Sequence, residues 1–373
     1  MKKFIPVNEP LIDKSDISSV KTTLKSGWIS SEGKSVKIFE NSFAKFIGHK
    51  YGITVANGTA ALEVAVQSLN LPKQSEVIIP NFTIFSNAIA SIKNNLKIIP
   101  IDCDLYDWNM NVNKIQKKIT NKTRLIIATH IYNYPLAIDI LKKICKKKNI
   151  YIIEDAAEVF GQKYQNKKCG SFGDISTYSF YANKQITTGE GGMITTNSKK
   201  ISDKLKSLRN LSFGKVNRFN HDDISSNNRM SNIQATLGLN QLKRINKIIK
   251  KRHFVGKQYF NLLSKNDNLF IPSPKTSYSK NIYWVVAVLI TNTNLKIDAN
   301  KVMKILNKKG IGTRPFFWPI HKQQTLKKYN FYNSNQFPNS EYISKYGFYL
   351  PSSLSLSVKK IRFICKCVNE IIK

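Results

Sequence analysis

The sequence predicts an α/β fold with two parts: a large domain built on a mostly parallel sheet, and a smaller C-terminal α+β domain. Between about residues 50 and 200, short apolar segments alternate with helical patterns, which is typical of strand–helix units. A long helical pattern over 232–263 follows and leads into a shorter set of elements. The length of 373 residues also suits two domains.

The expected elements of the large domain follow one another in a regular order. Strands are expected at 53–55, 77–79, 98–101, 125–128 and 151–153, and strand-like residues return at 176–181 and 194–196. Helices are expected between them at 86–92, 112–119 and 138–148. Strands connected in this way form a parallel sheet that is covered on both faces, and ligands bind at the carboxyl ends of its strands. Functional residues are therefore expected in the loops at that edge.

The smaller domain is expected to begin near the end of the long helical pattern. It should contain a strand at 283–290 and helices at 299–308 and 358–372. We therefore place the two domains at 1–250 and 251–373.

The composition is that of an ordinary globular protein, with 42% hydrophobic and 22% charged residues. No apolar run approaches the ~20 residues that a membrane-spanning helix needs. The first ten residues also lack the apolar segment of a secretory signal. The sequence therefore predicts a soluble, cytoplasmic protein that has no membrane partner.

The chain is strongly basic, with a net charge of +36 at pH 7. Such a charge can indicate nucleic-acid binding. However, only eight of the 59 basic residues are Arg, whereas base-reading surfaces favour its forked guanidinium. We interpret the charge as a lysine bias on solvated faces and expect no nucleic-acid partner. An anionic substrate or polymer is the alternative.

Cysteine and histidine patterns argue against disulfides and metal sites. The five cysteines include no C-x-x-C pair, and the five histidines include no H-x-x-x-H pair. The sequence therefore predicts neither a disulfide framework nor a metal site.

A short polar motif, Asn57-Gly58-Thr59-Ala60, follows the strand expected at 53–55 and opens a helix. A glycine, a hydroxyl group and free main-chain N–H groups at a helix N-terminus can bind an anion. The alternative is an ordinary N-cap by Asn57 or Thr59.

Two further motifs lie at the ends of later strands. Glu154-Asp155 directly follows the strand at 151–153, where a buried carboxylate needs a cationic partner. That partner could be a ring nitrogen of a bound molecule or a structural salt bridge. The second motif ends on Lys184 and is followed by a glycine-rich turn at 187–193, which allows close approach of a ligand. An ordinary surface lysine is the alternative for Lys184.

Together these motifs match what pyridoxal 5′-phosphate requires: a lysine for covalent attachment, an acid for the ring nitrogen and a helix N-terminus for the phosphate. At these residues the chain resembles the sugar-nucleotide aminotransferases of the DegT/DnrJ/EryC/StrS type. The resemblance extends over nearly the whole chain and includes the segments 27–31, 170–174 and 313–316. It implies the aspartate aminotransferase-like fold of pyridoxal phosphate enzymes, known as fold type I.

The resemblance also implies roles for individual residues. Lys184 would link covalently to the cofactor and move the proton, and Asp155 would keep the ring nitrogen protonated. The implied cofactor-binding residues are Gly58, Thr59, Ala60, Phe85, Asp155, Glu158, Ser179, Lys184 and Asn227. The implied substrate-binding residues are Trp28, Ser30, Arg314 and His321. Asn227 would come from the neighbouring subunit of a homodimer with shared active sites.

One departure from the family pattern concerns the cofactor ring. The family places an aromatic residue over this ring, but position 84 is Ile, so Phe85 is the aromatic candidate.

The implied activity is transfer of an amino group from glutamate to a nucleotide-linked 4-keto-6-deoxyhexose. The substrate would be GDP-4-keto-6-deoxymannose and the product GDP-perosamine, a precursor of surface glycans such as O-antigen. Two alternatives stay open: a dTDP- or UDP-linked 4-keto or 3-keto deoxysugar as substrate, and a non-enzymatic basic protein that binds nucleic acid.

Overall fold

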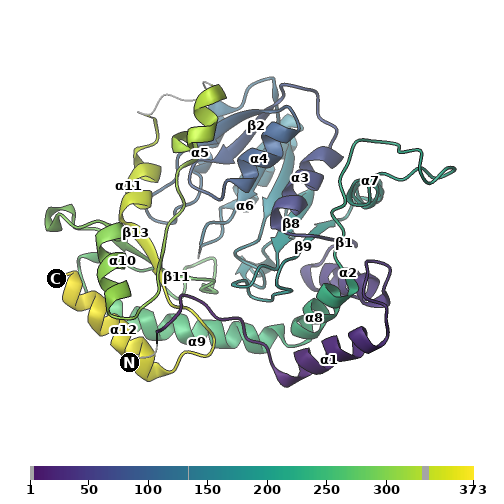
Figure 1. Cartoon of the computed structure of the whole chain (residues 1–373). Helices are drawn as coiled ribbons and strands as arrows, with labels where there is room; N and C mark the ends of the chain where they lie inside the picture. Colours follow the sequence, from purple (N-terminus) through teal and green to yellow (C-terminus); the bar gives the residue numbers. More distant parts are fainter. Residues whose placement is uncertain (1–3, 133, 330–335) are drawn as a thin grey trace.

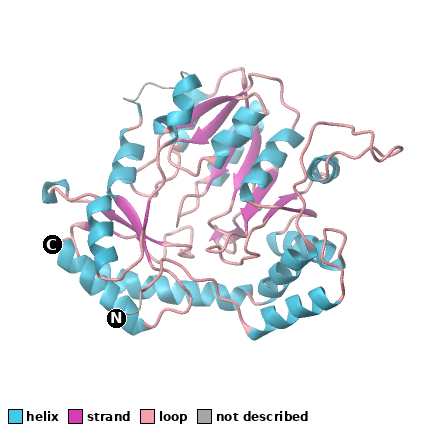
Figure 2. Ribbon diagram, viewed as in Figure 1, coloured by secondary structure: helices cyan, strands magenta, loops and turns pink. Residues whose placement is uncertain are grey.

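The structure is a computed structural model that describes residues 4–132, 134–329 and 336–373. A large sheet with helices on both faces lies beside a smaller sheet, and the long helix α9 (Ile245–Leu263) runs below both (Figures 1 and 2). None of the helices in these ranges is long and apolar enough to cross a lipid bilayer.

The large sheet has seven strands in the order β1-β9-β8-β5-β4-β2-β3. Strand β9 runs antiparallel to both of its neighbours, and the remaining adjacent pairs are parallel. The strands are β1 (Tyr51–Val55), β2 (Glu76–Pro80), β3 (Lys97–Ile101), β4 (Thr123–Thr129), β5 (Tyr151–Asp155), β8 (Ile175–Ser179) and β9 (Gly192–Thr196). This arrangement confirms the predicted α/β class with a mostly parallel sheet.

Each face of the large sheet packs on its own hydrophobic core. In β2, Ile78 belongs to one core and Val77 and Ile79 belong to the other, as expected when side chains alternate along a strand. The helices of the first core are α2 (Lys34–Ile47), α5 (Val112–Lys118), α6 (Ile138–Lys148), α8 (Asn232–Lys243) and the start of α9. The helices of the second core are α3 (Gly58–Ser68), α4 (Ser86–Lys93) and α7 (Lys199–Arg209). Helix α1 (Lys14–Lys25) packs along α8.

The smaller sheet is antiparallel and has the order β10-β11-β13-β12. Its strands are β10 (Leu269–Phe270), β11 (Val286–Ile290), β12 (Arg314–Pro315) and β13 (Gly347–Leu350), and its helices are α10 (Ala299–Lys308), α11 (Pro338–Tyr346) and α12 (Val358–Ile371). Short 3₁₀ helices at Thr293–Leu295, Ile320–Lys322 and Gln324–Tyr329 and a hairpin of β6 (Lys163–Tyr164) and β7 (Lys167–Lys168) complete the elements. The predicted boundary at 250 lies within α9, and the division into two domains stays a prediction.

Two predicted elements differ from the structure at their ends. The helix expected over 232–263 is divided at Arg244, which leaves helical geometry and pairs with Asp13 and Asp16 at the start of α1. The strand expected from 283 begins only at Val286, because Tyr283 has a left-handed φ of 49°. In both places tertiary contacts override a continuous apolar pattern.

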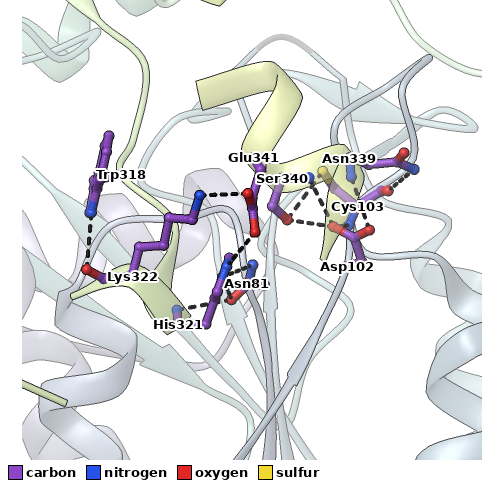
Figure 3. A network of polar contacts seen from close by, with 9 residues as sticks. All are labelled: Asn81, Asp102, Cys103, Trp318, His321, Lys322, Asn339, Ser340 and Glu341. Atoms are coloured by element: carbon purple, nitrogen blue, oxygen red, sulfur yellow. Dashed lines mark hydrogen bonds and ion pairs between the residues drawn. The ribbon is translucent and has the colours of Figure 1, made fainter. Parts of the chain in front are cut away.

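A polar network joins the smaller sheet region to the large sheet (Figure 3). Helix α11 has no side-chain cap of its own. Instead Asp102, which follows β3, accepts hydrogen bonds from the N–H groups of Asn339 at 3.2 Å and Ser340 at 2.9 Å, and from the Ser340 hydroxyl at 2.6 Å. A carboxylate from a distant part of the chain thus satisfies the open N–H groups of this helix and interacts favourably with its dipole.

Replacing Asp102 with Ala should lower the free energy of unfolding by about 3 kcal/mol, because it removes several hydrogen bonds to a buried charged acceptor. Urea unfolding would measure the loss. The matched control is Asp298→Ala, which removes the local cap of α10 and should cost about 1 kcal/mol. An equal loss in both variants would show that Asp102 does no more than an ordinary local cap.

Candidate active site

A cavity of about 550 Å³ opens at the carboxyl ends of β5 and β8, at the N-terminus of α3. This is the size of a small-molecule site, and its position is the one expected for a parallel sheet. Seven of the predicted site residues line it: Gly58, Thr59, Ala60, Asp155, Glu158, Ser179 and Lys184. Segments far apart in the sequence thus bring the three predicted motifs into one cavity.

The N-terminus of α3 offers N–H groups to this cavity. Asn57 caps the helix by accepting a hydrogen bond from the N–H of Ala60 at 2.8 Å, which confirms the N-cap alternative for Asn57. Within the described residues, the N–H groups of Gly58 and Thr59 have no protein acceptor. A side chain at position 58 would meet Ser179, since a Cβ there would lie 2.9 Å from the Ser179 Cβ. The glycine therefore keeps open a site suited to an anion.

The two carboxylates at the end of β5 point to opposite faces of the sheet. Glu154 is fully buried and lies 2.9 Å from His130 Nε2, and it accepts hydrogen bonds from the N–H groups of Phe172 and Gly173. Although burial favours its neutral form, these bonds hold the pKa of Glu154 below its ordinary value. Asp155 instead lines the cavity. Glu154 is therefore structural, and Asp155 is the carboxylate that a ligand can reach.

The contacts of Asp155 do not fully offset its burial. Within the described residues, the N–H of Ala157 at 3.3 Å is its one main-chain hydrogen-bond donor. Burial raises the pKa of Asp155, and the nearby Lys184 opposes this effect. A cationic group in the cavity would stabilise its ionised form.

Lys184 follows β8 and extends into the cavity. Its Nζ lies 3.5 Å from the centre of the Trp284 ring, a cation–π contact. Burial lowers the pKa of Lys184, and the carboxylates of Glu158 and Asp155 oppose this effect. The lysine is thus placed where its amine is more easily deprotonated than that of a surface lysine.

Glu158 lies beside Lys184 in the same cavity. Burial raises its pKa, and Lys184 opposes the shift. Its carboxylate accepts a hydrogen bond from the N–H of Tyr132, and the Tyr132 hydroxyl accepts one from the N–H of Phe317 at 3.1 Å. Phe317 also stacks on the Tyr132 ring and lines the cavity. Through Tyr132, Glu158 is thus linked to Phe317, a cavity-lining residue from the C-terminal region.

Comparison with known proteins agrees with this geometry. The family model of the DegT/DnrJ/EryC1/StrS aminotransferases matches residues 10–369. The chain belongs to this aminotransferase family. GDP-perosamine synthase of Escherichia coli O157:H7 is 37% identical to it over 369 residues, which cover 99% of this chain and 98% of that protein.

Two solved structures of sugar aminotransferases share the fold of this family member. PseC of Helicobacter pylori, an aminotransferase involved in the biosynthesis of pseudoaminic acid, superimposes with a TM-score of 0.93 at 24% identity and covers 99% of each chain. The pyridoxal phosphate form of Spr1654 from Streptococcus pneumoniae, described as a putative sugar aminotransferase, has a TM-score of 0.91 at 21% identity and covers 99% of this chain and 98% of its own. The predicted fold type I is thereby confirmed.

This aminotransferase uses pyridoxal 5′-phosphate, as its family does, and acts on a nucleotide-linked sugar. The residues present fit the cofactor. The open N–H groups of α3 suit its phosphate, the cavity has room for it, and Asp155 is a buried carboxylate that lacks a full complement of partners. Among the described residues, no group of His, Cys, Asp or Glu is arranged to hold a metal ion.

Phe85, the aromatic candidate for the cofactor ring, lies elsewhere. It packs against the second core of the large sheet, whereas Ile84 lines the cavity. Neighbouring residues at the start of a helix point in different directions, and here the aromatic side chain faces the core. Of these two neighbours, the aliphatic Ile84 therefore lines the cavity.

The two predicted substrate residues of the C-terminal region do not line the cavity either. His321 is buried in the network of Figure 3, where its Nε2 lies 3.0 Å from Glu341 Oε1 and its N–H donates to Asn81 at 3.2 Å. Burial lowers the pKa of His321, and Glu341 opposes this effect. Arg314 is exposed on β12, near Tyr349 of the cavity wall. In this structure His321 supports the segment that carries Phe317.

Trp28, Ser30 and Asn227 lie outside this chain's own cavity and are exposed. The loop with Trp28 and Ser30 is held by Asn232 at the start of α8, which donates to the carbonyl groups of both residues. Asn227 instead pairs with Asn210 in an isolated β-bridge.

Several cavity residues were not predicted from the sequence. The main ones are Tyr181, Asn183, Asn228, Trp284, Phe317 and Tyr349. Asn228 follows the predicted site residue Asn227, Trp284 lies in the strand expected at 283–290, and Asn183 precedes the lysine. Nothing in the local sequence distinguishes Tyr349 or Phe317, because they reach the cavity from the smaller sheet region.

Proposed function

We propose that this enzyme transfers an amino group from glutamate to GDP-4-keto-6-deoxymannose and forms GDP-perosamine. The observation that carries the proposal is its 37% identity, over nearly the full length, to a GDP-perosamine synthase. The product would be a precursor of surface glycans such as O-antigen.

The cavity supports this chemistry through residues of the chain. When bound, pyridoxal 5′-phosphate supplies an aldehyde that links to amines and a ring that accepts electrons from the reacting carbon. Lys184 Nζ would hold the cofactor covalently and then move a proton to and from the reacting carbon. The carboxylate of Asp155 would hold a proton on the ring nitrogen. The N–H groups of Gly58 and Thr59, with Ser179, would bind the phosphate.

Two other parts of the cavity would orient the reactants. Glu158 would lie beside the oxygen substituent of the cofactor ring, held in place by the N–H of Tyr132. Trp284, Phe317 and Tyr349 form an aromatic wall that would face the sugar. Such a wall excludes water and leaves hydrogen bonding to a few polar groups.

We also propose that the enzyme is a homodimer with shared active sites. Trp28, Ser30 and Asn227 do not reach the cavity of their own chain, so they would serve that of a partner subunit. Their loops also expose large apolar side chains, including Phe219 and Ile224, which are 77% and 93% exposed. Large apolar side chains with this much exposure suit a surface that is covered in an assembly.

Replacing Asn227 with Ala should weaken cofactor binding roughly 10- to 150-fold, because one hydrogen bond to a charged phosphate is worth about 1.5–3 kcal/mol. Mixing this variant with Lys184→Ala subunits gives a sharper result. In the mixed dimer, the site that keeps its lysine receives Asn227 from the other subunit and is intact. Activity should therefore reappear at limiting cofactor. No recovery despite verified subunit exchange would contradict shared sites.

An amination assay tests the substrate directly. Purified enzyme would be given glutamate and each of four ketones, namely GDP- and dTDP-linked 4-keto and 3-keto 6-deoxyhexoses. We expect the highest kcat/KM with the GDP-linked 4-keto sugar. Preference for a dTDP-linked or 3-keto sugar would reject GDP-perosamine as the product and favour the alternative substrate class.

We further propose that the enzyme works in the cytoplasm and does not bind nucleic acid. All five cysteines are free and buried, which suits a reducing compartment. Its basic charge would instead favour the anionic nucleotide-linked substrate.

A further inference from the structure

Arg252 on α9 is buried, with 3% of its surface exposed, and makes no ion pair within the described part of the chain. Burial lowers the pKa of Arg252 to about 10, so the guanidinium stays charged at neutral pH. A buried charge that no carboxylate neutralises is costly, and a hydrophobic residue in its place would avoid that cost. A specific arrangement of neighbours must therefore account for it.

The neighbours of Arg252 are four main-chain carbonyl groups from two segments. One nitrogen of the guanidinium donates to the carbonyl of Trp284 at 2.7 Å and to that of Tyr283 at 3.4 Å. The other donates to the carbonyls of Asn183 and Lys184, both at 3.3 Å. The fork of the guanidinium therefore spans the segment that carries the active-site lysine and the segment that carries its aromatic neighbour.

Independent contacts hold the same two segments together. The indole Nε1 of Trp284 donates to the carbonyl of Asn183 at 3.1 Å, and Lys184 Nζ lies over the Trp284 ring. Tyr283 adopts a left-handed φ of 49°, which costs energy for an aromatic residue. Gly256, one turn after Arg252, leaves space that the Tyr283 ring fills. Helix α9 thus lies close enough for Arg252 to maintain this strained backbone.

The charge of Arg252 also acts on the lysine. Three charged side chains face the Lys184 amine: Asp155 and Glu158 favour its protonated form, and Arg252 opposes it. Since no carboxylate in the described part of the chain pairs with Arg252, no ion pair reduces this repulsion.

We propose that Arg252 is a positioning residue for Lys184, because its guanidinium ties the lysine segment to the Trp284 segment. Its charge, which has no ion-pair partner among the described residues, would in addition disfavour a proton on the lysine amine. A neutral amine is the form that attacks the aldehyde of the cofactor, so Arg252 would prepare the lysine for attachment. This inference rests on the proposed role of Lys184.

The test measures how the reactivity of the Lys184 amine depends on pH in protein that holds no cofactor. Cofactor-free protein is treated with trace acetic anhydride between pH 6 and 10, and acetylation of the Lys184 peptide is quantified against exposed Lys146 by mass spectrometry. The midpoint of the Lys184 profile reports deprotonation of its amine, and Lys146 serves as the reference for the amount of reagent. In Arg252→Gln we expect the Lys184 midpoint to rise by about one pH unit, since the opposing charge is gone. The matched control is Arg244→Gln, which breaks the ion pairs that the residue between α8 and α9 makes with Asp13 and Asp16, and it should leave the midpoint unchanged.

Arg252→Lys separates charge from geometry. The ammonium keeps the charge but cannot span both carbonyl pairs, so the midpoint should stay near that of the wild type. Attachment of added cofactor, followed at ~410–430 nm, should nevertheless be about tenfold slower. This variant keeps the proposal testable if Arg252→Gln does not fold.

Two results would overturn the inference. Equal Lys184 midpoints in the wild type and Arg252→Gln would show that the charge has no effect, and wild-type attachment in Arg252→Lys would remove the positioning role. Borohydride trapping distinguishes a third case. Cofactor trapped on a lysine other than Lys184 would refute the assigned role of Lys184, whereas the acetylation profile of the cofactor-free protein still reports on Arg252.

Discussion

Replacing Lys184 with Ala should abolish amino transfer and remove the absorption band of the lysine-linked cofactor from the purified enzyme. The wild type should absorb near ~410–430 nm because its cofactor is linked to a protonated lysine nitrogen. Alanine has no amine to form this link or to move the proton during transfer. Cofactor should still bind non-covalently, since Gly58, Thr59 and Asp155 are unchanged. Absorption spectra and single-turnover assays with glutamate would measure both effects.

Lys146→Ala is the matched control, because Lys146 is an exposed lysine on α6. It should retain the colour and the activity of the wild type. Borohydride reduction of the wild type, followed by peptide mapping, should tag Lys184. A tag on any other lysine, or turnover by Lys184→Ala, would contradict the assignment.

Replacing Asp155 with Asn should lower the transfer rate by about three orders of magnitude while cofactor binding persists. The buried carboxylate would hold a positive charge on the ring nitrogen, and a neutral ring takes up negative charge poorly. Because that charge develops mainly in the transition state, the loss should fall on kcat more than on KM. Steady-state kinetics, with cofactor content measured for each preparation, would check it.

The neighbouring carboxylate provides the control for Asp155. Glu154→Gln keeps the shape of the side chain but weakens its bonds to His130 and the main chain on the other face of the sheet. It should lower stability and leave the rate of the folded enzyme within about tenfold of wild type. Near-normal turnover by Asp155→Asn would remove Asp155 from the mechanism. If Glu154→Gln lowered the transfer rate as much as Asp155→Asn does, the effect of Asp155 would not depend on its position in the cavity, and this would contradict its assigned role.

The large sheet could be predicted from the sequence because the patterns that indicate its strands each extend over only a few residues. Apolar segments such as 77–79 and 151–153 are short, alternate with helical patterns and lie in the observed strands β2 and β5. The motif with Gly58 lies between β1 and α3, Asp155 ends β5, and Lys184 follows β8. The topology of the sheet brings all three motifs to one edge, where they line the cavity. The resemblance to the aminotransferases rests on the same motifs.

The sequence could not predict which side chain of a neighbouring pair faces the cavity. Ile84 rather than Phe85 lines it, and it is the resemblance to the aminotransferases, not the local pattern, that singles out Asp155 over Glu154. The sequence shows that the side chains of consecutive residues point in different directions. Which of the two points into the cavity depends on how the surrounding elements pack. The sequence also could not predict that His321 lies in a buried network away from the cavity lining, since its partners Asn81 and Glu341 come from other parts of the chain.

By itself, the sequence determined the α/β class, the order of the strands along the chain and the three motifs of the cavity. Only the tertiary structure decided that Asp102 caps α11, that Trp284 lies over Lys184, and that Arg252 joins the segments of both. Hydrophobic periodicity and turn chemistry act over a few residues, so they can be recognised in the sequence. Contacts between residues 183–184, 252 and 283–284 depend instead on how helices and two sheets pack, and this packing is settled by the whole core together.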